Sequence, residues 1–223
     1  MDVATAISLL AVWVAVLVSW AGGRHVALAV AALMAIEYRL AASGSLRQWE
    51  QRPPLLMVLV VVAAAGAFLL ARSRRLDRVP LAALVGAQSF RLPLELTMHR
   101  AYTEGLMPQQ MSVSGYNFDI VTGAAAILVG GLVWRGVAPR WLIFAWNLAG
   151  SILLATIVGI AIASTPMFAA FGPDRLNTWV AGPPYVWLPG VLVPAALLGH
   201  LAVWRRLAAS ATSSPLPAHA SGS

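Results

Sequence analysis

The sequence predicts an all-α protein, a polytopic bundle of seven transmembrane helices with its N-terminus outside and its C-terminus in the cytoplasm. First, the 223 residues are 60% hydrophobic and 10% charged, with a mean hydropathy of +0.78. Soluble domains do not have such a composition. Second, the chain divides into apolar segments of about 20 residues, the length that crosses roughly 30 Å of hydrocarbon. Third, arginines are unevenly distributed between alternate loops, as in membrane proteins.

Seven apolar segments can be placed along the chain. The first follows Met1 and Asp2, which carry no positive side chain, so a membrane span is favoured over a cleaved signal peptide. The third is almost wholly aliphatic and is expected to face lipid. The seventh contains Pro189 and Pro194, which should kink or break it. The segments are Val3 to Ala21, His25 to Ala42, Pro54 to Ala71, Val79 to Arg100, Phe118 to Trp134, Trp141 to Ser164, and Tyr185 to Trp204.

The fifth and sixth segments are rich in small residues. Such residues allow helix backbones to approach closely inside a membrane. We therefore expect these two segments to pack tightly against neighbouring helices. The small residues include Gly123, Gly130, Gly131, Gly150 and Gly159.

The arginines determine the predicted orientation and location. Cytoplasmic loops of membrane proteins carry an excess of positive residues. With the N-terminus outside, nine arginines lie on the inside and four on the outside, which favours this orientation. Abundant alanine and arginine without lysine are typical of a bacterium with a GC-rich genome, so the membrane is expected to be a bacterial inner membrane. The inside set is Arg24, Arg72, Arg74, Arg75, Arg78, Arg135, Arg140, Arg205 and Arg206, and the outside set is Arg47, Arg52, Arg100 and Arg175.

The predicted domain organisation is one transmembrane domain, residues 1–206, followed by a disordered cytoplasmic tail, residues 207–223. The tail is rich in Ala, Ser and Pro and lacks periodicity. The net charge of +7 indicates contact with anionic lipid head groups. No basic surface with interleaved aromatic residues is apparent, so nucleic acid is excluded as a partner.

Two missing residue types exclude several chemistries. All 15 basic residues are arginine, so no lysine can form a Schiff base with retinal. The chain also lacks cysteine, which excludes disulfides, thiolate metal sites and cysteine nucleophiles.

The fourth segment carries a polar stripe. Gln88, Arg91, Glu95, His99 and Tyr102 are spaced by three and four residues. At 100° per residue they lie within an arc of about 80° on one helix face. Charged residues inside a span face protein or water rather than lipid, so this face should point into the bundle.

Two other segments bring polar residues to the same predicted leaflet. Glu37 lies in the second segment, and Asn117 and Asp119 lie at the start of the fifth, where they are also suited to cap the helix. Glu104 lies in the connecting loop. We therefore predict a polar pocket in the outer leaflet, formed by the second, fourth and fifth helices and roofed by Ala101 to Asn117.

The leading functional hypothesis from sequence is binding or transfer of a small or lipid-like ligand with an anionic group. Arg91 would act as the counter-ion of that group, while Glu95, His99 and Tyr102 would set the polarity of the pocket around it. Intramembrane charges are costly and usually functional, which is the reason for this hypothesis. The predicted ligand contacts are Glu37, Gln88, Arg91, Tyr102, Glu104, Asn117 and Asp119.

Several alternatives remain open at this level. Glu95 and His99 could be the acid and base of an intramembrane enzyme, or could bind a metal with Asp119. The acidic residues could support proton-coupled transport, or the chain could be a structural subunit of a membrane complex or a homo-oligomer. A haem held by His25 and His200 at the cytoplasmic side is disfavoured, because histidines are ordinary at helix ends.

Overall fold

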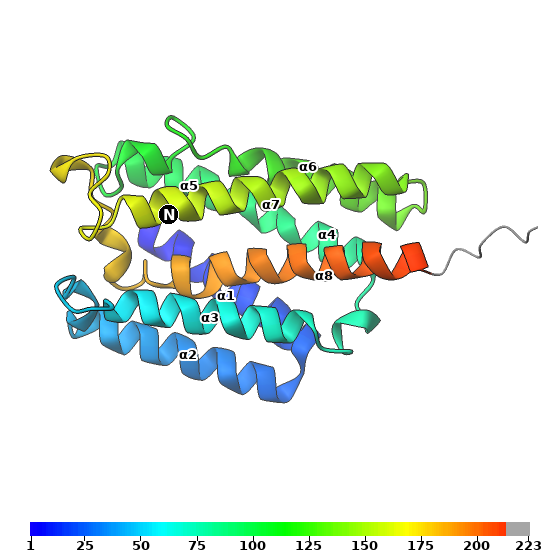
Figure 1. Cartoon of the computed structure of the whole chain (residues 1–223), viewed down its shortest axis with the longest axis horizontal. Helices are drawn as coiled ribbons and strands as arrows, with labels where there is room; N and C mark the ends of the chain where they lie inside the picture. Colours follow the sequence, from blue (N-terminus) through cyan, green and yellow to red (C-terminus); the bar gives the residue numbers. More distant parts are fainter. Residues whose placement is uncertain (213–223) are drawn as a thin grey trace, which may run out of the picture.

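The computed structural model describes residues 1–212, and all regular structure within this range is helical. The helices lie side by side in an elongated bundle (Figure 1). The N-terminus and the loops after α2, α5 and α7 gather at one end, and the loops after α1, α3 and α6 gather at the other (Figure 1). The α-helices are α1 (Val3–Gly22), α2 (Arg24–Ala42), α3 (Leu55–Ala71), α4 (Leu81–Ala87), α5 (Arg91–Thr103), α6 (Asp119–Trp134), α7 (Arg140–Ala163) and α8 (Val193–Thr212).

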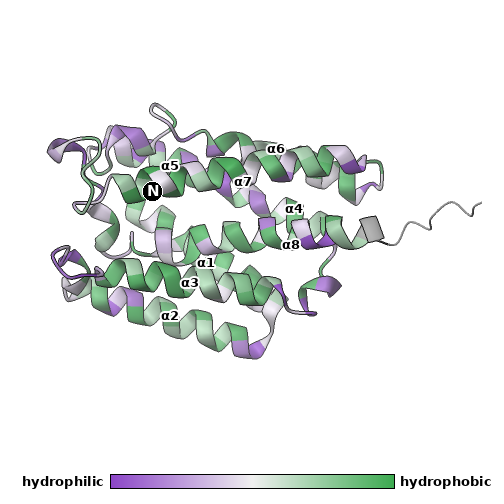
Figure 2. Cartoon of the chain, in the orientation of Figure 1, coloured by the Kyte–Doolittle hydropathy of each residue, from purple (hydrophilic) through white to green (hydrophobic). Residues whose placement is uncertain are grey.

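Four helical stretches of the described chain are long and apolar enough to cross a membrane. They are α1, α2, α7 and the stretch Leu188–Ala209. Helices α3 and α6 are apolar but shorter, with 17 and 16 residues. The bundle is mainly apolar along its length, and hydrophilic residues are concentrated near its two ends (Figure 2).

The fourth predicted span is not one α-helix. It is divided into α4, a 3₁₀ turn η3 (Gln88–Phe90) and α5. Pro93 explains the position of the turn, because it has no N–H to donate to the carbonyl of Ser89 four residues earlier. The path stays helical, but the turn changes the direction of the side chains between Gln88 and Arg91.

The seventh predicted span begins with a distorted turn and ends later than expected. Leu188–Leu192 form a π-helical turn, η7, next to Pro189 and Pro194, which confirms the predicted irregularity. Helix α8 then continues beyond the predicted end at Trp204 to Thr212. Residues 207–212 of the predicted disordered tail are therefore helical, and residues 213–223 lie outside the described range.

Helix α8 lies at the centre of the bundle. It contacts α3, α4 and α7, and Figure 1 shows it running between α3 and α7. Large apolar side chains that point outward, including Leu9, Val61, Leu128 and Ile152, cover the outer surface. An apolar surface of this extent is suited to contact with lipid.

Glycines bring α6 against α4 and α5, as predicted from its small residues. A Cβ atom on Gly123 would lie 2.5 Å from the backbone nitrogen of Leu92. A Cβ atom on Gly130 would lie 3.1 Å from the Cα of Gly86. This close contact of backbones brings the N-terminal end of α6, with Asp119, beside Arg91.

The substitution Gly123→Ala should therefore destabilise the protein. The added methyl group meets backbone that cannot rotate away, and over-packing of this kind costs about 1–3 kcal/mol. Gly131→Ala on the same helix is the matched control, because no atom lies within 4 Å of its new Cβ. Thermal unfolding in detergent, followed by circular dichroism, should show a lower midpoint for Gly123→Ala and an unchanged or higher midpoint for Gly131→Ala. Equal midpoints would contradict the tight packing of α6.

Candidate functional site

Arg91 lies at the centre of a polar network that joins α5, α6 and α8. Its side chain is 1% exposed. Its Nε donates a hydrogen bond to Asp119 Oδ2 at 2.7 Å, and its Nη2 contacts the same oxygen. Its Nη1 lies 2.7 Å from Nε2 of His200. All three guanidinium nitrogens therefore have partners within the protein.

His200 connects Arg91 to α7. Its Nδ1 lies 2.8 Å from Oδ1 of Asn147, whose Nδ2 donates to the backbone carbonyl of His200 at 3.2 Å. Because an amide oxygen only accepts hydrogen bonds, Nδ1 carries the proton, and Nε2 accepts from Arg91. Gly150 on α7 leaves the space for this ring, since a Cβ there would lie 2.5 Å from Cε1 of His200.

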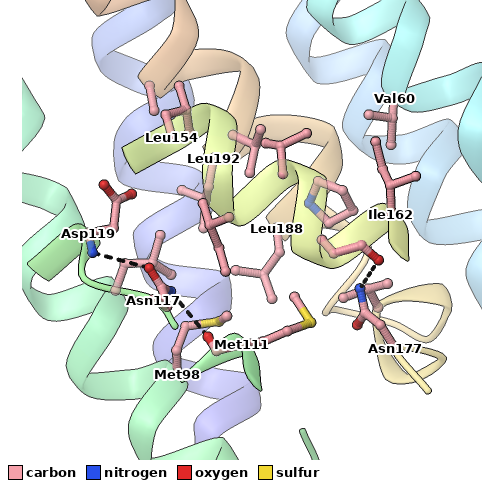
Figure 3. Close-up of a pocket in the computed structure, with 18 of the residues that line it drawn as sticks. Val60, Met98, Met111, Asn117, Asp119, Leu154, Ile162, Asn177, Leu188 and Leu192 are labelled. Carbon is pink, nitrogen blue, oxygen red and sulfur yellow. Dashed lines mark hydrogen bonds between the residues drawn. The ribbon is translucent and has the colours of Figure 1, made fainter. Parts of the chain in front are cut away.

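Asn117 connects the network to the loop before α6. Its Nδ2 donates to Glu95 Oε2 at 2.6 Å. The same Nδ2 donates to the carbonyl of Met111 at 3.1 Å, and Oδ1 accepts from the N–H of Asp119 at 3.2 Å (Figure 3). The last of these bonds satisfies the first N–H of α6, although Phe118, and not Asn117, is the N-cap residue of this helix. Asp119 pairs with Arg91 through its side chain, and this contact is not evident from its position at a helix start.

The network includes two residues that the sequence analysis did not select. His200 was assigned to the cytoplasmic boundary, but α8 continues for twelve more residues, about 18 Å at 1.5 Å per residue. Both of its ring nitrogens are hydrogen-bonded, so neither is free to bind haem iron, while His25 is exposed beside Arg24. Asn147 was detectable, because an amide inside an apolar span is itself a signal of a buried polar contact.

The outer part of the predicted stripe does not join this network. His99 Nδ1 lies 3.4 Å from Ser114 Oγ, and its ring packs on Tyr102. Glu104 forms an ion pair with Arg100 near the surface. No hydrogen bond joins Glu95 to His99, so the predicted acid and base pair is not assembled.

The candidate metal site is also not assembled in the described part of the chain. Glu95, His99 and Asp119 were the predicted ligands. Residues 1–212 contain no group of three or more His, Cys, Asp or Glu side chains close enough to hold a metal ion. Glu95 and Asp119 instead accept hydrogen bonds from Asn117 and Arg91, respectively.

Gln88 and Glu37 are buried but lie apart from the Arg91 contacts. Gln88 packs its amide against Gly199 of α8, and its Oε1 has no partner among the described residues. Glu37 is 0% exposed and lies against Gly190 of η7. Neither of its carboxyl oxygens has a hydrogen-bond partner within residues 1–212. Glu37 therefore makes no hydrogen bond to the Arg91 network.

A cavity of about 190 Å³ lies beside the network, between α3, α5, α7 and the start of α8. Its walls are mainly apolar, as Leu154, Leu188 and Leu192 in Figure 3 illustrate. Its polar lining falls into two groups, and Figure 3 shows Asn117 and Asp119 on the side of the cavity opposite Asn177. The larger group, here called the polar end, consists of Arg91, Glu95, Asn117 and Asp119, and the smaller group is Thr165 and Asn177.

The polar end of the cavity offers hydrogen-bond acceptors to a ligand, whereas its one cation, Arg91, is already paired. Asp119 neutralises Arg91, and its Oδ1 has no hydrogen-bond partner in the described chain. The second carboxylate, Glu95, has a neutral amide, Asn117, as its hydrogen-bond partner. The cavity therefore presents two acidic side chains with only one arginine.

Asp119→Asn should be strongly destabilising. The substitution leaves a buried guanidinium without its carboxylate, and breaking a buried ion pair in this way costs about 3–5 kcal/mol. Asp77→Asn is the control, because it breaks an exposed pair with Arg205, worth about 1 kcal/mol or less. The midpoint of thermal unfolding in detergent measures the loss of stability in both variants. The double variant Arg91→Met with Asp119→Leu should regain much of the loss, since it removes both charges. Similar midpoints for Asp119→Asn and Asp77→Asn would argue against the central role of the pair.

Comparisons of this chain with family models, with curated proteins and with solved structures found no match. The feature of the molecule that bears on function is the geometry of the network and its cavity. That geometry is a buried, internally paired arginine at the polar end of an apolar cavity.

Proposed function

We propose that the chain is an integral protein of a bacterial inner membrane, with seven membrane-crossing segments and its N-terminus outside. Four long apolar helices support membrane insertion. The two shorter apolar helices, α3 and α6, and the continuous helical path from α4 to α5 would supply the other crossings. The nine-to-four distribution of arginines supports the orientation.

Single cysteines test this orientation, because the natural chain has none. Ser114→Cys lies in the loop before α6, and Val137→Cys lies in the loop after it, and both positions are exposed. A membrane-impermeant maleimide should label Ser114→Cys in intact spheroplasts and Val137→Cys only after permeabilisation. The reverse pattern would contradict an outside N-terminus, and labelling of both in intact cells would contradict a crossing by α6.

We further propose that the cavity binds a lipid-like ligand, with an apolar chain against its walls and a polar head at the network. The observation that carries this proposal is a mainly apolar wall whose charged side chains, Arg91, Glu95 and Asp119, all belong to the polar end. Binding sites for small molecules are commonly apolar, with a few polar groups that fix orientation.

A ligand could enter this cavity from the side. Val61 of α3 and Ile162 of α7 line the cavity and are also exposed on the outer surface, Val61 by 66%. The cavity therefore reaches the apolar exterior between α3 and α7. An amphipathic molecule could pass from the bilayer into the cavity without crossing the polar ends of the bundle.

The contacts of Arg91 favour a particular kind of head group. The sequence suggested an anionic group bound by Arg91, but Asp119 already neutralises this arginine. The open acceptor is Oδ1 of Asp119, with the Glu95 carboxylate nearby at the same end. We therefore propose a head group with hydrogen-bond donors, such as a hydroxyl or an ammonium group.

Val158→Phe tests occupancy of the cavity. Val158 lines the cavity wall, so a larger ring fills the space that the apolar chain would use. Holding both the new ring and the apolar chain of the ligand would over-pack the cavity, at a cost of about 1–3 kcal/mol. This cost corresponds to a loss of ligand affinity of roughly 5- to 150-fold. Ile152→Phe is the matched control, because Ile152 lies on the exposed side of the same helix.

Mass spectrometry of the amphiphiles that co-purify with the protein is the measurement. Wild-type protein and Ile152→Phe should retain the same amphiphile in similar amounts, and Val158→Phe should retain much less. Glu95→Gln should also reduce retention of a head group with hydrogen-bond donors, because it replaces one carboxyl oxygen with an amide nitrogen that donates. Equal retention by Val158→Phe and Ile152→Phe, or no bound amphiphile in the wild type, would refute the proposal.

A further inference from the structure

Arginines without acidic partners gather at the end of the bundle that is far from the N-terminus. The loop after α3 contains four exposed arginines and one acidic residue, Asp77. Asp77 is already paired, because its Oδ1 accepts from Nη2 of Arg205 at 2.6 Å. The positive charge of this loop is therefore not neutralised within the described chain. The four arginines are Arg72, Arg74, Arg75 and Arg78.

Gly23 brings one of these arginines to the turn between α1 and α2. The residue has a φ of 81°, and Nη1 of Arg75 lies within contact distance of the place where a side chain would begin. Arg24 follows directly in the sequence and is also exposed. Arg75, from a distant loop, therefore reaches the turn that carries Arg24, whose Nε lies 3.4 Å from Nε2 of the neighbouring His25.

An apolar groove of about 620 Å³ leads to this turn between α1 and α2. Arg24 and Gly23 line its charged end, and Trp20, which is 71% exposed, lies beside them. Tryptophan is enriched at the boundary between hydrocarbon and head groups. The remaining walls are mainly aliphatic and include Val16, Ala27, Val30 and Met34.

We propose that this groove is a binding site for an anionic phospholipid. The phosphate would lie between Arg24 and Arg75, since guanidinium groups form paired hydrogen bonds with phosphate oxygens. One acyl chain would lie along the apolar walls, with Trp20 at the level of the head group. The lipid is the favoured occupant because one molecule matches both the apolar walls and the uncompensated positive end.

The proposal rests on placement of the protein in a membrane and is independent of the ligand proposed for the internal cavity. That cavity lies between α3, α5, α7 and the start of α8, whereas the groove is formed by α1 and α2. Anionic lipids are concentrated in the cytoplasmic leaflet, where the predicted orientation places Arg24 and Arg75. Failure of either proposal would leave the other unaffected.

The test is native mass spectrometry of the purified full chain titrated with phosphatidylglycerol and, separately, with phosphatidylcholine of the same acyl chains. The variant carries both Arg24→Gln and Arg75→Gln. The matched control carries both Arg74→Gln and Arg135→Gln, which remove the same charge from exposed positions that neither line the groove, as Arg24 does, nor approach Gly23, as Arg75 does. Ala27→Phe tests the apolar wall with the arginines intact.

The wild type and the matched control should bind one phosphatidylglycerol at least tenfold more tightly than phosphatidylcholine. The variant with both Arg24→Gln and Arg75→Gln should lose this preference. Ala27→Phe should weaken the binding of both lipids. All variants change exposed or half-buried positions, and unchanged thermal midpoints verify their folding.

Three results would overturn the proposal. An equal loss in the matched control would mean that only the overall charge matters. Displacement of the lipid by inorganic phosphate, with Ala27→Phe behaving as wild type, would mean that the site binds a free anion. Equal binding of the two lipids by the wild type would mean that the arginines do not select the head group.

Discussion

The ion pair between Arg91 and Asp119 is the contact on which the interior of this bundle depends. A guanidinium that is 1% exposed inside an apolar bundle requires a carboxylate and further hydrogen-bond partners. Asp119 supplies the charge from α6, and His200 supplies an acceptor from α8. Because these partners lie on different helices, the arginine fixes how α5, α6 and α8 are positioned relative to one another.

Glycine makes this arrangement possible. The backbones of α5 and α6 approach closely at Gly123, which places Asp119 beside Arg91. Other buried polar side chains also lie against glycines, with His200 beside Gly150, Gln88 beside Gly199 and Glu37 beside Gly190. Each glycine thus leaves space on one helix that a polar side chain from another helix fills. The polar side chains are enclosed in this way without large gaps in the apolar packing.

The irregular turns place the cavity beside the network. The 3₁₀ turn η3 precedes Arg91, and the π-helical turn η7 contributes Leu188, Pro189 and Leu192 to the cavity wall. Proline accounts for both irregularities, since it lacks the N–H that would continue the helix. The resulting space has an apolar wall and a polar end, and this arrangement supports the proposed lipid-like ligand.

The sequence by itself determined the helical class, the positions of most helices and the polar character of Arg91, Glu95, Asn117 and Asp119. Hydropathy and helical periodicity are local properties, so they can be read from the residues alone. Only the tertiary structure decided which polar residues meet. It brought in His200 and Asn147 from distant helices, and it left His99, Tyr102, Glu104 and Glu37 outside the Arg91 network. The physical reason is that helix rotation and contact depend on packing between segments far apart in the chain, with glycines and proline-induced turns setting the distances.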